Sequence, residues 1–354
     1  MTRLGIRLVL AISLLITGGA RSVAADGSEK APDFQEVLNL IRTHATGLGE
    51  AELNRAAVQG LVGELGSRVA LIGEDNPEDA RATEPLLSRM DVLADDLGYF
   101  RISRVAAGLG DAIRAGFDEI QQTNKLVGIV LDLRYATGQD YAAAVAVADL
   151  FCPDSVPLLD FGSGVVRAQP KSNAIQVPIA ILVNSETAGA PEALAATLRA
   201  NGTGLILGSS TAGEALIARE FPLQSGDRLR IATAPVALGD GTRLPSDGVK
   251  PDIDVAVAPA LERAYFADSF YIVPQTNLVA AAGNSGTNTA STARRVRLNE
   301  AELVREHRQN FSRTTNAAPR VRDVEPESPV VSDPALARAL DLLKGLAVVR
   351  RTRS

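Results

Sequence analysis

The residues of this chain that could do nucleophilic chemistry gather in two short segments rich in small side chains. The segment 183–192 (VNSETAGAPE) contains Ser185 and Thr187, and the segment 207–215 (LGSSTAGEA) places three further hydroxyl residues beside Glu214. A hydroxyl becomes a nucleophile when a neighbouring base takes its proton, so a serine or threonine served by Glu214 is one enzymatic arrangement. Hydroxyl residues in such turns more commonly cap backbone groups, and that role is the expected one here.

Other kinds of catalytic or binding site have little support. His44 and His307 are the two histidines and lie far in sequence from both segments, so we expect neither a histidine-dependent triad nor a zinc site. No phosphate loop, dinucleotide fingerprint or calcium loop is present, and we expect no cofactor and no metal. Cys152 is the single cysteine, which excludes an internal disulfide and predicts a small buried side chain. The net charge of −6 with no basic patch argues against a nucleic-acid partner.

The first 25 residues have the pattern of a secretory signal peptide. Arg3 and Arg7 precede an apolar run at 8–16, and Val23-Ala24-Ala25 offers small residues for cleavage near Ala25. The run is too short for an ordinary transmembrane helix, so no integral membrane segment beyond the signal is expected. The protein is therefore predicted to be periplasmic or secreted, with an uncleaved signal retained as an anchor as the alternative.

Residues 26–94 are expected to form an N-terminal helical segment. Apolar residues recur at helical spacing within 33–42 and again within 50–65. The acidic, proline-bearing stretch 74–87 has the composition of a connecting loop.

The middle of the chain, residues 95–256, alternates strands with helices, which predicts an α/β core. Continuous apolar runs at 128–133 (GIVLDL) and 178–183 (PIAILV) are typical of strands buried on both faces. The remaining elements expected here are strands at 98–102 and 204–207, helices at 108–121, 139–151 and 191–200, and a hairpin over 221–236 that turns at 225–227.

The C-terminal extension, residues 257–354, combines linker-like composition with two predicted helices. Residues 283–295 and 312–331 are typical of flexible linkers. One helix is expected over 299–310. The other begins with Asp333 as N-cap and Pro334 in the first turn, and it places Leu336, Leu340 and Leu343 on one face.

Five segments of the core resemble, in the same order, the motifs of one peptidase family. They are GYFRIS at 98–103, VLDLRYATGQD at 130–140, VNSETAGAPEALAATLRANG at 183–202, LGSSTAGEA at 207–215 and SDGVKPDIDV at 246–255. These segments resemble the C-terminal processing, or tail-specific, peptidases. The resemblance implies an exported serine peptidase that uses a Ser-Lys dyad on a ClpP/crotonase-like fold. Many members insert a PDZ domain before the core, but about thirty residues between Arg68 and Gly98 are too few for one.

The same resemblance locates the positions where the catalytic residues should stand. Gly189 matches the nucleophilic serine, and Glu192 agrees with a family glutamate three residues later. Glu214, twenty-five residues beyond Gly189, matches the general-base lysine, and Ala218 matches a glutamine that often follows it. A glycine has no group that can attack a carbonyl, so the dyad is degenerate and no catalytic residue is intact.

A residual oxyanion hole is still expected, because such holes are built from backbone amides that substitutions do not remove. Gly138 keeps one family glycine in the turn after 130–134, while Gln139 replaces its neighbour. Ala190 would supply the second amide. Gly138 and Ala190 together predict a carbonyl-binding or peptide-binding site that remains although the dyad is lost.

Three functions remain open on the sequence. The first is an exported pseudopeptidase that binds a peptide or a partner protein without cleaving it, with a homo-oligomer also possible and the C-terminal helix as a docking element. The second is a serine-type endopeptidase with Ser185 or Thr187 as a relocated nucleophile. The third is a crotonase-like small-molecule site, because that fold supports many reactions with paired backbone amides.

Overall fold

The computed structural model describes residues 32–73, 84–272 and 331–351 of the 354-residue chain. The chain divides into two compact units, residues 1–63 and 64–354. The predicted signal peptide, the predicted linker at 283–295 and the predicted helix over 299–310, with His307, all lie outside the described residues.

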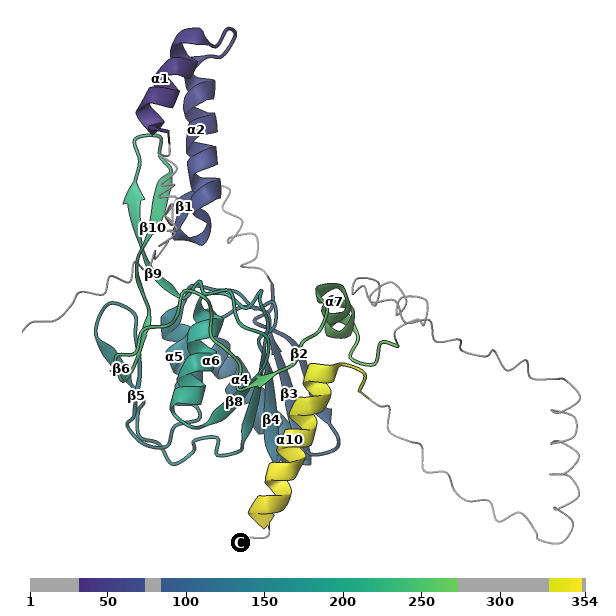
Figure 1. The fold of residues 1–354 in the computed structure, drawn as a ribbon. Coiled ribbons are helices and arrows are strands. Elements are labelled where there is room, and N and C mark those ends of the chain that lie inside the picture. Colours follow the sequence, from purple (N-terminus) through teal and green to yellow (C-terminus); the bar gives the residue numbers. More distant parts are fainter. Residues whose placement is uncertain (1–31, 74–83, 273–330, 352–354) are drawn as a thin grey trace, which may run out of the picture. The chain divides into compact units, whose positions relative to one another are not determined.

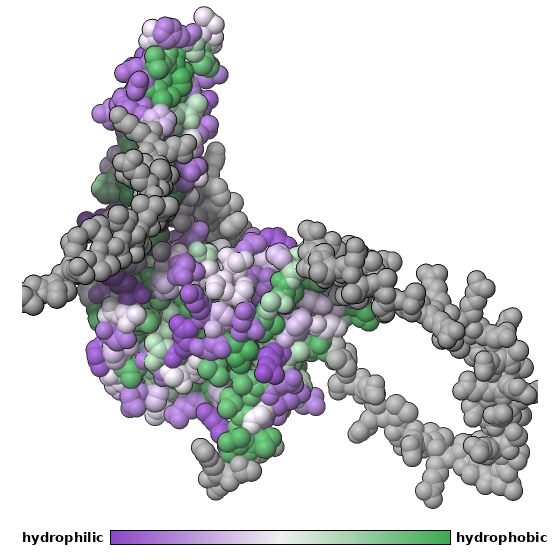
Figure 2. Space-filling view, in the orientation of Figure 1, coloured by the Kyte–Doolittle hydropathy of each residue, from purple (hydrophilic) through white to green (hydrophobic). Residues whose placement is uncertain are grey.

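The N-terminal unit contains the two predicted helices, α1 (Phe34–His44) and α2 (Glu50–Leu65). The Asp33 side chain accepts a hydrogen bond from the Glu36 amide and caps the start of α1. His44 lies in the last turn of α1, where a basic side chain suits the helix dipole. Several large apolar side chains of this pair, Phe34 among them, are exposed, and Figure 2 shows hydrophobic residues at its surface.

The larger unit is organised around a six-stranded sheet in the order β12-β8-β7-β4-β3-β2. All neighbouring strands are parallel except β2 and β3, which form an antiparallel pair. The strands are β2 (Leu87–Leu93), β3 (Leu97–Ile102), β4 (Gly128–Asp132), β7 (Ile179–Val183), β8 (Gly204–Gly208) and β12 (Ile253–Asp254). Every residue of β3, β4 and β7 is buried, as the continuous apolar runs predicted. The sheet begins at Leu87, ahead of the boundary predicted at residue 95.

Helices cover both faces of this sheet, which makes a three-layer α/β core (Figure 1). Helices α4 (Leu109–Thr123), α5 (Tyr141–Asp149) and α6 (Ala190–Ala200) pack on one face, where Ile129 and Leu131 point. Helix α10 (Pro334–Arg351) packs on the other, against Val130 and its neighbours. Cys152 is buried among the first group, as predicted.

Helix α10 is the C-terminal helix that the sequence predicted, and its N-cap is confirmed. The carboxylate of Asp333 accepts hydrogen bonds from the amides of Ala335 and Leu336. The apolar face predicted from its leucines is buried in the core, with Leu336 only 1 % exposed. The inner face of this helix is thus occupied by the chain's own sheet, which leaves only its outer face for the docking role expected from the sequence.

Two smaller sheets flank the core. The first has the order β1-β10-β9 and consists of β1 (Val69–Ile72), β9 (Leu216–Pro222) and β10 (Arg228–Pro235). The β9–β10 hairpin turns at 225–227 as predicted, although it begins five residues earlier than expected. The second sheet, in the order β11-β5-β6, contains β5 (Pro157–Asp160), β6 (Val165–Arg167) and β11 (Ala237–Leu238). Helix α7 (Pro259–Ala267) follows β12. None of the described helices combines the length and apolar character needed to cross a lipid bilayer.

Candidate functional site

Gly189 lies on the sharp turn between strand β7 and helix α6. Its backbone has φ 75° and ψ −123°, and α6 begins at the next residue, Ala190. In α/β hydrolases a strained strand-to-helix turn of this kind presents the nucleophile. Glycine adopts such a conformation without steric cost, whereas other residues are strained there. The backbone therefore has the geometry of a nucleophile turn, but the residue supplies no reactive group.

Glu192 joins the two positions that the sequence matched to the serine and the lysine. Its side chain is 1 % exposed, and its Oε1 accepts hydrogen bonds from the amides of Gly189 at 2.8 Å and Glu214 at 2.7 Å. Its Oε2 accepts from the Gly213 amide and from the Thr211 hydroxyl. One buried carboxylate thus ties the β7–α6 turn to the loop after β8, and it brings positions 25 residues apart into one site.

The Glu192 carboxylate should be sensitive even to a change that keeps its shape. In Glu192→Gln an NH2 group replaces one acceptor and faces donors, so at least one buried donor loses its partner. We expect the free energy of unfolding to fall by about 2 kcal/mol, measured by urea denaturation. The matched control is Glu119→Gln on the exposed side of α4, which should change stability by less than about 0.5 kcal/mol. Equal losses in the two variants would contradict this role for Glu192.

The predicted oxyanion pair is adjacent in the structure, but it does not form an oxyanion hole. The Ala190 amide donates a hydrogen bond of 2.7 Å to the carbonyl oxygen of Gly138. A Cβ atom built on Gly189 would lie 2.3 Å from that same oxygen and 3.0 Å from Nε2 of Gln139. Because Gly189 has no Cβ, the Gly138 carbonyl oxygen can come close enough to accept the hydrogen bond of the Ala190 amide. That amide is then not available to a substrate. The expectation of two free converging amides is therefore wrong for this structure.

A small polar cleft of about 300 Å³ lies beside this turn. It is open to solvent, and Glu214 and Gln139 lie in its wall with the one hydroxyl side chain of the lining, Thr137. The lining residues are Arg104, Val105, Ala106, Thr137, Gly138, Gln139, Asp140, Ala188 and Glu214. Within the described residues no three His, Cys, Asp or Glu side chains gather as metal ligands. Arg104 and Thr137 were not predicted as site residues, because neither matches a catalytic position of the family.

The two alternative nucleophiles are not supported by their surroundings. Thr187 is 0 % exposed, and its hydroxyl donates to the Leu133 carbonyl oxygen at 2.9 Å. This arrangement contradicts Thr187 as a nucleophile, because the hydroxyl is inaccessible and already bonded. Ser185 is exposed in the turn after β7 but does not line the cleft that contains Glu214. Ala218 lies in β9 opposite Ala232, also outside the cleft lining.

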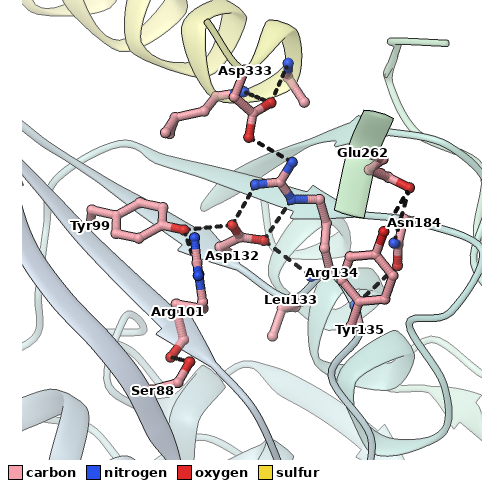
Figure 3. A network of polar contacts seen from close by, with 12 residues as sticks. Ser88, Tyr99, Arg101, Asp132, Leu133, Arg134, Tyr135, Asn184, Glu262 and Asp333 are labelled. Atoms are coloured by element: carbon pink, nitrogen blue, oxygen red, sulfur yellow. Dashed lines mark hydrogen bonds and ion pairs between the residues drawn. The ribbon is translucent and has the colours of Figure 1, made fainter. Parts of the chain in front are cut away.

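Charged residues at the end of strand β4 form a buried network on the α10 side of the sheet (Figure 3). The Arg134 guanidinium lies between two carboxylates, 2.7 Å from Asp132 and 2.8 Å from Asp333, and all three side chains are at most 1 % exposed. Tyr99 donates a hydrogen bond to Asp132, and Arg101 donates to Tyr99. Burial alone would raise the pKa of Asp132, but Arg134 and Tyr99 lower it below its ordinary value. The network has a structural role, because it fastens the start of α10 to the end of β4.

A second polar cluster connects the turns that follow β4 and β7 (Figure 3). The Asn184 side-chain oxygen accepts from the Tyr135 amide at 3.1 Å, and its NH2 group donates to Glu262 of α7 at 3.2 Å. Tyr135, with φ 60°, packs its ring edge-on against Phe266. Burial raises the pKa of Tyr135 to about 12 and also raises the pKa of Glu262. These contacts hold the two turns that build the cleft.

Comparison with known proteins identifies the core. The sequence profile of "Peptidase family S41" matches residues 96–255. The "Carboxy-terminal-processing protease" of Bartonella bacilliformis is 28% identical over 214 residues, which cover 56% of this chain and 49% of that protein. The "Carboxyl-terminal-processing peptidase 2, chloroplastic" of Arabidopsis thaliana is 29% identical over 215 residues, which cover 55% and 42%. A solved structure, "Photosystem II D1 C-terminal processing protease", aligns with a TM-score of 0.42 at 27% identity over 49% of each chain.

The chain spans about half the length of the curated relatives it matches. The matched region begins beside β3 and ends at Val255, just after β12, so it contains every strand of the large sheet except β2, together with the β7–α6 turn and the cleft. The matching profile and the shared core segments identify residues 96–255 as a core of peptidase family S41, the family of the C-terminal processing peptidases.

Proposed function

We propose that this protein is a non-catalytic member of the family, a pseudopeptidase that binds a polypeptide without cleaving it. The observation that carries the proposal is the β7–α6 turn, where Gly189 has the backbone of a nucleophile position and the Gly138 carbonyl packs against it. The space that a catalytic side chain would occupy is taken by main chain.

Peptide hydrolysis by this family's chemistry needs a nucleophile, a base and donors for the developing oxyanion. Position 189 lacks the nucleophile, position 214 has a carboxylate in place of the lysine amine, and the Ala190 amide is bonded to Gly138. In serine peptidases that have lost the triad, the residual acceleration of about 10³–10⁴ over water comes from the oxyanion hole and substrate binding. Here even that contribution is reduced, so the expected rate is close to that of the uncatalysed reaction.

The sequence pattern at 1–25 supports export to the periplasm or secretion as part of this proposal. In that compartment, a fold related to processing peptidases that no longer cuts would act by holding polypeptide. Its partner would be a peptide or a protein chain, and neither a cofactor nor a nucleic acid is needed.

The proposal predicts that the purified protein neither cleaves a polypeptide substrate nor becomes labelled by a probe for activated serines. Incubated with fluorescein-labelled unfolded casein, it should release no fluorescent peptides above a buffer control. It should also not react with a fluorophosphonate probe, because Gly189 offers no activated hydroxyl. The variants Thr137→Val and Ser185→Ala, purified in the same way, are assayed in parallel. They test whether either hydroxyl is the source of any cleavage or labelling that remains.

Cleavage that co-purifies with the protein and is lost in Thr137→Val or in Ser185→Ala would overturn the proposal. Such a result would identify a relocated nucleophile in or near the cleft. Cleavage that is equal in the wild type and in both variants, and that disappears on further purification, identifies a contaminating peptidase and leaves the proposal in place.

A further inference from the structure

Strand β10 is paired along its whole length on one side, but along only half of it on the other. Its β9 neighbour pairs from Arg228 to Pro235, with a shift in register between Ala232 and Ala234. On the opposite side β1 pairs only with residues 228–231, and the chain before β1 forms the 3₁₀ turn Gly66–Arg68 instead of a longer strand. None of the described strands continues β1 beside residues 232–235. An incompletely paired strand edge is a template for adding another strand.

The open half of β10 lines a cavity of about 530 Å³. Most of its lining consists of small or aliphatic side chains, which leave room for an extended backbone. The lining residues are Arg68, Gly213, Ala215, Leu216, Ala232, Thr233, Ala234, Pro235, Arg243, Leu244, Pro245 and Ser246. At one end the cavity is limited by Arg68, which precedes β1. At the other end lies the 243–246 loop, where the Leu244 amide donates to the Val236 carbonyl at 2.9 Å.

The length of the gap suits a short extended segment. Four residues of β10, 232–235, span about 13 Å at roughly 3.3 Å per residue. An added segment of three or four residues would therefore fill the space between the start of β1 and the 243–246 loop. Every second side chain of the added segment would face Ala232 and Ala234, and at these positions the added segment can carry only small residues.

The charge of the lining has one sign. Arg68 and Arg243 both belong to it, and none of the described residues that line the cavity is an aspartate or a glutamate. Both arginines are exposed, and neither forms an ion pair with a described residue. By contrast Arg228, on the same sheet, is held by Glu220 at 2.8 Å. Two guanidinium groups that no described carboxylate pairs with, at opposite ends of a strand-shaped gap, are suited to the carboxylate side chains of a ligand.

We propose that an extended acidic segment of a partner protein binds here, adding a strand beside residues 232–235 of β10 in line with β1. Backbone hydrogen bonds to β10 supply the affinity, small side chains face the cavity, and Asp or Glu side chains reach Arg68 and Arg243. The inference deepens the proposed function, on which it rests in one respect: the bound segment is held and not cut.

A synthetic peptide tests this site on the full-length protein. The probe is a fluorescein-labelled octapeptide of alternating alanine and glutamate, acetylated at its N-terminus and amidated at its C-terminus. Its dissociation constant is measured by fluorescence anisotropy at low salt. Arg243→Glu should weaken binding at least about tenfold, because it replaces an attractive charge with a repulsive one. Arg219→Glu, an exposed charge reversal in β9 outside the cavity lining, should change the dissociation constant less than about twofold.

Three control peptides separate strand addition from general attraction of charges. The same octapeptide methylated on alternate backbone nitrogens should not bind, because it cannot pair with β10. Its lysine counterpart should also not bind. An alanine octapeptide with a free carboxyl terminus should bind more weakly than the acidic probe, because it carries one carboxylate.

The proposal is overturned if Arg243→Glu binds the probe like the wild type, or if Arg219→Glu weakens binding equally. Retained binding of the methylated peptide would exclude strand addition, and tighter binding of the free-carboxyl peptide would replace an internal acidic segment with a chain end. Electrophoresis of the same incubations distinguishes the two proposals. Cleaved probe would refute the proposed function, whereas uncleaved probe that fails to bind would refute the docking site alone.

Discussion

Replacing Asp333 with alanine should lower the free energy of unfolding by about 3–5 kcal/mol. The change leaves the buried Arg134 guanidinium with only one of its two carboxylates and removes the N-cap of α10. Breaking a buried ion pair by removing one partner is costly, because the remaining charge stays in a medium of low polarity. Urea denaturation followed by circular dichroism measures the loss.

Two further variants divide this effect into its parts. Asp333→Asn keeps a side chain that caps helices well but removes the charge, so its loss should come mainly from the ion pair with Arg134. Asp341→Ala alters an exposed carboxylate on the same helix and should change stability by less than about 0.5 kcal/mol. If Asp333→Ala is no more destabilising than Asp341→Ala, the network does not fasten α10.

A methyl group at Gly189 should destabilise the protein by at least about 3 kcal/mol. In Gly189→Ala the new Cβ would meet the Gly138 carbonyl oxygen at 2.3 Å, and the residue would keep a backbone conformation, φ 75°, that L-residues rarely adopt. Strained backbone and overpacking each cost about 1–3 kcal/mol. Thermal and urea denaturation of the purified variant measure the effect.

Gly202 provides a matched control, since it has a similar φ of 67° with no atom within 4 Å of its Cβ position. Gly202→Ala should therefore show the backbone cost alone, about 1–2 kcal/mol. Equal losses in Gly189→Ala and Gly202→Ala would mean that the Gly138 carbonyl does not fill the position. The same clash affects any attempt to reactivate the protein. A serine at 189 with a lysine at 214 requires the Gly138–Gln139 peptide to rotate before a nucleophile can fit.

Much of the α/β core could be predicted because its signals are local. The runs at 128–133 and 178–183 contain the residues that became fully buried parallel strands, and Asp333 followed by Pro334 marked the start of α10. Strand β2 was not predicted. Its sequence LSRMDVL mixes charged and apolar residues, as befits the edge of a sheet, and its burial alternates in part.

The features that define the candidate site depend on contacts between distant segments, and sequence patterns do not show these. Glu192 was recognised as one residue of a motif, but its four donors come from two segments, the β7–α6 turn and residues 211–214. The hydrogen bond from the Ala190 amide to the Gly138 carbonyl joins two backbone groups, so no residue type in the sequence indicates it. A missing Cβ at position 189 was visible in the sequence, but what fills its place depends on the fold.

The position of α10 in the sequence has a consequence for how the chain is made. Val130, Ala180 and Leu182 are all made by the middle of synthesis, whereas the helix that covers them consists of residues 334–351. While the ribosome adds the intervening residues, the apolar face of the sheet that α10 will cover stays exposed to solvent, and exposed apolar surface promotes aggregation. The native core can therefore close only after residues 334–343 have been made and have left the ribosome.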